Sequence, residues 1–110
     1  MKLPKHIKIG AHKVKVLYPY IYKERFDRYG HYDHSAEEIA IQEIDAGGSK
    51  RKNKSILISL IHETLHGIDT TTGYCLFDDN ETALVGIAEG LAQVLLENPK
   101  LVKLFLKRKL

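Results

Sequence analysis

The stretch from Ser55 to Asp69 constrains the fold of this chain more than any other. It reads SILISLIHETLHGID and is mostly apolar apart from a His-Glu-x-x-His motif, so it predicts a helix. An i, i+4 spacing places His62 and His66 one turn apart on the same helical face. Two imidazoles in this relation can hold a zinc ion, and Glu63 is then placed to act on water. The stretch therefore predicts a helix that presents a metal site.

Two other interpretations of the motif stay open. His62 and His66 could be core residues whose ring nitrogens are satisfied by hydrogen bonds, with Glu63 on a solvated face. Zinc could also bind there in a structural or degenerate site. An intact Glu63 argues against that second alternative, because a structural site does not need the carboxylate.

The size of the chain limits its organisation. Its 110 residues predict a single domain with one modest core. Within it we expect a sheet-containing part (1–49), a part with the zinc-site helices (50–98) and a tail helix (99–110). The net charge of +3 is too mild to indicate nucleic acid by itself.

The sequence also carries signals about the cellular compartment. Cys75 is the only cysteine, so no disulfide can form within the chain, and a reducing compartment is expected. Lys2, Lys5, Lys8 and Lys13 interrupt the apolar residues at the start, which does not fit a signal peptide. No apolar run reaches membrane-spanning length. We therefore expect a cytoplasmic protein with no membrane partner.

The N-terminal part predicts three strands. Apolar and polar residues alternate over residues 6–18, and Gly10 and Ala11 indicate a hairpin turn between two short strands. Pro19 is expected to end the second strand. Residues 20–35 predict a short helix or an irregular segment, residues 38–44 a third strand, and residues 45–54 a basic, glycine-containing loop.

The C-terminal part predicts helices. The motif helix should begin near Lys52 or Asn53 and end near Thr71 or Thr72, with Gly73 as its breaker. A second helix should open within residues 78–81 and run to about residue 97, and a short amphipathic tail helix should cover residues 100–110. The predicted fold is α+β: a small three-stranded, mostly antiparallel sheet on an active-site helix and a second long helix, followed by the short C-terminal helix.

A catalytic zinc site usually needs a third protein ligand. Glu81 is our first choice, because 14 residues separate it from His66 and allow the chain to reverse and pack the two helices together. It could instead form a capping box with Asp78. Asp69 shares the helical face of the histidines, and we expect it to have a supporting or structural role. Glu89 is a weaker alternative ligand.

Other residues could approach a metal. Cys75 could do so as a thiolate, although a lone cysteine is usually a small buried apolar residue. His31 and His34, with Asp33 between them, could bind a metal in a loop, and the solvated alternative is favoured there.

These residues carry a resemblance to a known family. The sequence His62-Glu63-x-x-His66, followed on another helix by Asn80-Glu81, resembles the zinc-binding pattern of gluzincin metallopeptidases. In length the chain is similar to minigluzincins and selecase-type peptidases; the resemblance covers residues 37–97 and, in outline, the N-terminal third. It implies one zinc ion bound by His62, His66 and Glu81, with Glu63 as general base and acid.

The resemblance has one departure. Larger gluzincins often carry an aspartate four residues after the ligand glutamate, where it orients a zinc histidine. This chain has Val85 at that position, and Asp69 is a candidate for the role.

The function implied is that of a zinc endopeptidase acting on peptides or unfolded proteins through a metal-activated water. Tyr74 is the nearest tyrosine in sequence that could stabilise the oxyanion, and a substrate could pair with strand 38–44 if that strand lies at the sheet edge. The resemblance also implies latency, either by the C-terminal tail or by self-association into a homo-oligomer.

The alternative is a non-catalytic basic adaptor for nucleic acid or protein. It would use two basic runs, at residues 50–54 and 107–109. No recognised nucleic-acid motif accompanies these runs, so nucleic acid is not the expected partner.

Overall fold

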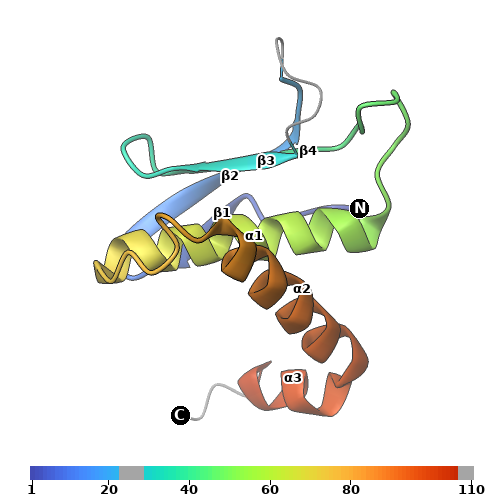
Figure 1. Cartoon of the computed structure of the whole chain (residues 1–110). Coiled ribbons are helices and arrows are strands. Elements are labelled where there is room, and N and C mark those ends of the chain that lie inside the picture. Colours follow the sequence, from blue (N-terminus) through green and yellow to red (C-terminus); the bar gives the residue numbers. More distant parts are fainter. Residues whose placement is uncertain (23–28, 107–110) are drawn as a thin grey trace.

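The computed structural model describes residues 1–22 and 29–106. Within them the chain forms an α+β fold (Figure 1), which confirms the predicted class. The strands are β1 (His6–Ile9), β2 (His12–Tyr20), β3 (Gly30–Asp33) and β4 (Glu38–Gln42), and the helices are α1 (Asn53–Thr72), α2 (Glu81–Glu97) and α3 (Pro99–Leu106).

The first two strands form the predicted hairpin. β1 and β2 are antiparallel, with Ile7 opposite Val14. The chain turns at Gly10, whose φ of 59° lies in the left-handed region that glycine adopts without strain. The hairpin prediction is therefore confirmed.

The sheet as a whole is mixed and has the order β1-β2-β4-β3. β4 runs parallel to β2, and β3 pairs antiparallel with β4 at the edge of the sheet. The prediction of three mostly antiparallel strands is thus wrong in two details: the sheet has a fourth strand, β3, and its β2–β4 pair is parallel. β3 falls in the segment expected to be a short helix or irregular, because its four residues, Gly-His-Tyr-Asp, are too few for a recognisable alternation. Residues 23–28 of that segment lie outside the described residues.

Two predicted strand ends also differ. β2 continues through Pro19 to Tyr20, but its register with β4 shifts between Leu17 and Tyr20. Proline lacks an N–H and is tolerated where the ladder is irregular, which explains why the strand does not stop there. β4 ends at Gln42, two residues earlier than expected, and Ile44 instead forms an isolated bridge with Lys50.

The two long helices begin and end close to the predicted positions. Gly73, with a φ of 79°, ends α1, and its N–H donates to the carbonyl oxygens of Asp69 and Thr70. Asn80 caps α2, and its side-chain oxygen accepts from the N–H of Ala83 at 3.2 Å. α3 covers residues 99–106, and residues 107–110 of the predicted tail helix lie outside the described part.

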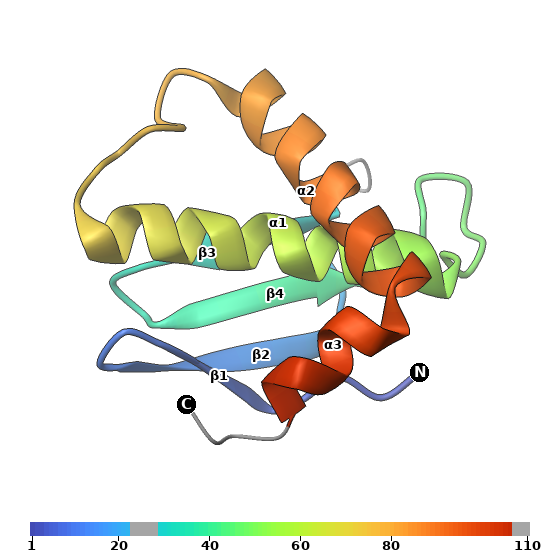
Figure 2. The same ribbon diagram turned by 90° about the horizontal axis from the view of Figure 1, so that it is seen from below.

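The elements form layers around α1. One face of the sheet packs on α1, and the core consists of Ile9, Val14, Ile39, Ile41 and Ile56. α2 lies on the other side of α1 (Figures 1 and 2) and contacts no strand among the described elements. The sheet therefore packs on α1 alone, and the expectation that it would also cover the second long helix is wrong. None of the described helices has the length and apolar character needed to cross a bilayer.

Arg51 ties the end of β4 to the start of α1. Only 8% of this residue is exposed, although it lies in a run of basic residues. Its guanidinium donates to the carbonyl oxygen of Gln42 at 2.7 Å, to the hydroxyl of Ser59 at 2.6 Å and to the carbonyl oxygen of Ser55 at 3.1 Å. It also lies 4.5 Å from the ring centroid of Tyr29. Burial lowers the pKa of Arg51, and the bonds compensate for that burial.

Removing this guanidinium should destabilise the fold. We expect Arg51→Met to lower the free energy of unfolding by about 2–3 kcal/mol, because the buried oxygens lose a charged donor. Lys52→Met removes the same charge from the exposed neighbour and should change stability by less than about 0.5 kcal/mol. Urea unfolding of both variants measures the difference. Equal stabilities would contradict a structural role for Arg51.

Candidate metal centre

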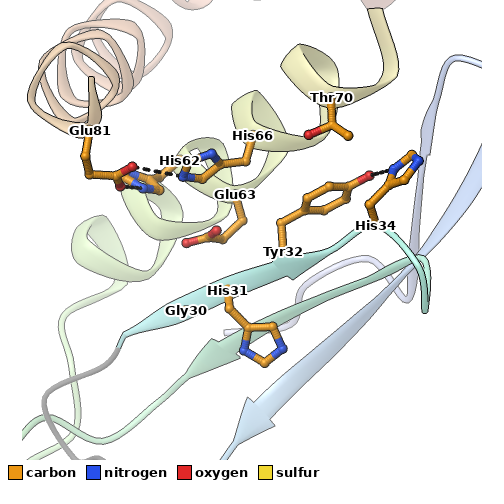
Figure 3. Close-up of a pocket in the computed structure, with 9 residues that line it drawn as sticks. All are labelled: Gly30, His31, Tyr32, His34, His62, Glu63, His66, Thr70 and Glu81. Carbon is orange, nitrogen blue, oxygen red and sulfur yellow. Dashed lines mark hydrogen bonds and ion pairs between the residues drawn. The ribbon is translucent and has the colours of Figure 1, made fainter. Parts of the chain in front are cut away.

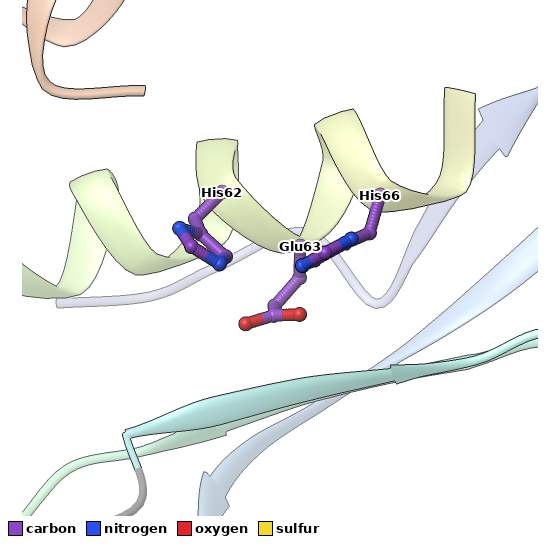
Figure 4. Close-up of side chains that lie close together, drawn as sticks. All are labelled: His62, Glu63 and His66. Atoms are coloured by element: carbon purple, nitrogen blue, oxygen red, sulfur yellow. The ribbon is translucent and has the colours of Figure 1, made fainter. Parts of the chain in front are cut away.

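The candidate site is built on α1. His62, Glu63 and His66 come from consecutive turns of this helix, and one ligand atom of each lies within 4.8 Å of the others (Figure 4). They form the one group of three or more metal-ligand side chains found among the described residues. The spacing predicted from the motif is thus realised in the fold.

Glu81 reaches the two histidines from the first residue of α2 (Figure 3). One carboxylate oxygen lies 2.6 Å from Nε2 of His62, and the other lies 3.2 Å from Nε2 of His66. The carboxylate therefore spans both imidazoles. The structure brings together all three predicted ligands, and Glu81 points to the rings and does not serve as a capping-box partner of Asp78.

Asp69 holds the loop that leads to Glu81. Its side-chain oxygens accept hydrogen bonds from the backbone N–H groups of Leu76 at 2.8 Å and Phe77 at 3.0 Å. Asp69 is 6% exposed, so these amides replace its contacts with water. Its role is to fix the turn between α1 and α2. Both of its side-chain oxygens are directed to these amides and not to a histidine ring, so the orienting role is not supported.

Glu63 lies on the side of α1 that faces the sheet. It is 7% exposed, and a Cβ atom placed on Gly30 of β3 would lie 3.3 Å from its Oε2 atom. The absence of a side chain at Gly30 thus leaves room for the carboxylate between α1 and β3. Glu63 and Glu81 consequently approach the histidines from different directions (Figure 3).

A cleft of about 530 Å³ gives access to these side chains. It is lined by Gly30, His31, Tyr32, His34, His62, Glu63, His66, Thr70 and Glu81. β3 forms one wall, α1 the floor and the start of α2 the other wall (Figure 3). α3 contributes no lining residue, so within the described residues the tail does not fill the cleft.

Tyr32 and His34 line the cleft and were not predicted as a pair. The Tyr32 hydroxyl lies 2.7 Å from Nδ1 of His34, and burial raises the pKa of that hydroxyl. The Tyr32 ring packs against α1, where a Cβ on Gly67 would lie 3.2 Å from it. Tyr74, considered as an oxyanion donor, is 75% exposed and does not line the cleft. Tyr32 can be recognised as a cleft residue only when β3 is placed at the sheet edge, and the sequence did not predict that strand.

His31 and His34 do not converge on a metal. Nδ1 of His31 lies 2.6 Å from the hydroxyl of Tyr22, whereas Nδ1 of His34 lies beside Tyr32. His31 lies in β3 and His34 in the turn that follows it, and Figure 3 shows their side chains on opposite sides of the strand. The alternative of a second metal site at this histidine pair is therefore not supported.

Two further candidate metal ligands, Cys75 and Glu89, also do not join the two histidines of the motif. Cys75 is exposed, so it is not the small buried apolar residue expected of a lone cysteine, and the charge of Asp78 raises the pKa of its thiol. A raised pKa disfavours the thiolate that a metal requires. Glu89 lines a different cavity, beside Arg51.

Comparisons of the chain with family models, curated proteins and solved structures found no match.

Loss of the Asp69 carboxylate should loosen the turn that carries Glu81. We expect Asp69→Asn to lower the free energy of unfolding by about 2–3 kcal/mol, since an NH2 group, which only donates, replaces one of the two oxygens that accept from the backbone N–H groups. Amide hydrogen exchange should accelerate at Leu76 and Phe77 in particular. Asp79→Asn, an exposed change in the same loop, is the matched control. Unchanged exchange at both amides would rule out the anchoring role.

Proposed function

We propose that this chain is a zinc-dependent endopeptidase that hydrolyses peptide bonds. One observation carries the proposal: the Glu81 carboxylate meets Nε2 of both His62 and His66, while Glu63 lies beside them on α1, at the floor of an open cleft. Two imidazoles and one carboxylate from a separate helix make up the donor set of catalytic zinc sites in peptidases, and the carboxylate directly after the first histidine serves there as the general base.

The three side chains fit a zinc ion with an accessible position. The side chains of His62 and His66 are 18% and 30% exposed, and that of Glu81 is 59% exposed, so the group opens toward solvent on the cleft side. A structural zinc site is closed by four protein ligands; here Glu63 is the fourth carboxylate or imidazole near the group, and we assign it to the reaction and not to the ligand set. When bound in such a site, zinc supplies Lewis acidity that makes a water molecule acidic near pH 7 and polarises a carbonyl oxygen.

Glu63 would move the protons of the reaction. From its position between α1 and Gly30 its carboxylate would accept a proton from the attacking water and return it to the leaving amine. This double role needs a carboxylate that does not itself bind the metal, and Glu81 takes up the third ligand position. The low exposure of Glu63 keeps bulk water from competing for that proton.

The substrate would bind as an extended strand. β4 corresponds to strand 38–44, which could pair with a substrate only at the edge of the sheet. It lies inside the sheet, between β2 and β3, so it is not at the edge. Among the described strands β3 is the one that borders the cleft, and a peptide added beside it would pass over Glu63. β3 is thus the edge that we assign to substrate binding.

The alternative function, a basic adaptor, is less well supported. Arg51, in the middle of the first basic run, is buried and bonded to backbone oxygens, so it is not available to phosphate groups. Salt-sensitive retention on DNA or RNA, in the absence of zinc, would favour this alternative.

Separate variants test the ligand and the general base. We expect about one zinc per wild-type chain by elemental analysis, a strong loss of zinc in Glu81→Gln, and full zinc occupancy in Glu63→Gln. Cleavage of an unfolded protein substrate should fall by about 10²–10⁴-fold in Glu63→Gln. Glu89→Gln removes an exposed carboxylate of the same helix outside the cleft and should change neither property.

The proposal would fail in two ways. If the wild type binds no zinc after incubation with the metal, the role of His62 and His66 is structural. Zinc binding that depends on Glu81, without any cleavage that depends on Glu63, would leave a metal site that is not a peptidase.

A further inference from the structure

The helices α2 and α3 leave a large apolar surface without a partner among the described residues. We call residues 81–106 the α2–α3 arm, because α3 contacts only α2 among the described elements and lies at the far end of that helix (Figure 1). The arm carries nine large apolar side chains that are 38–70% exposed: Val85, Ile87, Leu91, Val94, Leu96, Leu101, Leu104, Phe105 and Leu106.

The total surface of the chain is larger than its mass predicts. The accessible area is 7916 Å² for 12.5 kDa, against about 6,200 Å² for a folded monomer of that mass. The radius of gyration is 14.4 Å, where about 13 Å is typical. A standard protein interface takes about 800 Å² from each partner, so the excess is enough for one.

The exposed apolar residues form stripes on both helices. Ile87, Leu91 and Val94 recur on α2 at the spacing of one helical face, beside the buried face that packs on α1. On α3, Leu101, Leu104 and Phe105 recur at the same kind of spacing and are 40%, 60% and 65% exposed. Each chain thus presents two apolar stripes, one on each helix of the arm.

The two helices carry opposite charges. α2 contains three glutamates and no lysine or arginine, and α3 contains two lysines and no acidic residue. Three more basic residues follow α3 in the sequence at 107–109. An anionic membrane or a nucleic acid would attract α3 but repel α2. A second copy of the chain matches the charges of both helices, because α3 of each copy can lie on α2 of the other.

We propose that this chain forms a two-fold symmetric dimer in which α3 of each copy packs across α2 of its partner. Each copy then contributes the same two stripes, as an isologous interface requires, and every contact occurs twice. The apolar stripes meet at the centre, and the lysines of α3 lie near Glu89 and Glu97 of the other copy's α2. The inference does not depend on zinc or on peptidase activity.

Sedimentation equilibrium of the full chain tests the proposal, with a chelator present so that metal ions cannot bridge chains. We expect wild-type protein at micromolar concentration to have twice the 12.5 kDa chain mass. Phe105→Glu should sediment as a monomer, because it places a charge in the stripe of α3. Ile21→Glu makes the same kind of change at a 71% exposed site outside the arm and should remain dimeric.

A cross-link tests the arrangement of the helices. In a Cys75→Ser background, chains with Leu104→Cys and chains with Leu91→Cys should form a mixed disulfide when combined, and neither of these chains should do so with an Ile21→Cys chain. Circular dichroism of Phe105→Glu confirms that loss of the dimer is not loss of the fold.

Two results would overturn the inference. A wild-type monomer would overturn the dimer itself, and binding of that monomer to phosphatidylserine vesicles through Phe105 would identify a membrane as the occupant. A dimer that survives Phe105→Glu would overturn the proposed interface.

Discussion

The close packing of α1 on the sheet at Gly67 sets the orientation of the whole site. A Cβ at this position would lie 2.7 Å from Cδ1 of Ile9 and 3.2 Å from the Tyr32 ring, so a larger residue would have to displace these two side chains. Glu63 is one turn before Gly67 on the same face of α1 and is therefore held against the sheet. His62 and His66 then lie on the adjoining face, where α2 can reach them. The direction of each functional side chain thus follows from one helix–sheet contact.

The second half of the site depends on how α2 is attached. Among the described elements α2 makes no contact with the sheet, and its position is set by its packing on α1 and by the turn that Asp69 fixes. Glu81, the first residue of α2, contacts α1 through the imidazoles of His62 and His66. The start of the helix is thus held at several points, whereas its far end, with α3, extends away from the rest of the chain. The same helix supplies a candidate metal ligand at one end and an apolar surface at the other.

Much of the helical part could be predicted from the sequence, because the signals are local. The His-Glu-x-x-His spacing, the Asn80 cap and the Gly73 terminator each act within a few residues, and their positions agree with the structure. The choice of Glu81 was also local in part, since it needed only a short connection between two antiparallel neighbours. What could not be predicted depends on contacts between distant residues. The four-residue strand β3 exists because β4 offers it a partner, and its own alternation is too short to recognise.

The central claim is that His62, His66 and Glu81 bind one zinc ion, and anomalous diffraction at the zinc edge from zinc-loaded crystals tests it most directly. The account predicts one strong peak about 2.0–2.2 Å from Nε2 of both histidines and from a carboxylate oxygen of Glu81, with Glu63 outside the ligand set. A peak at other side chains, or no peak at these three, would contradict it.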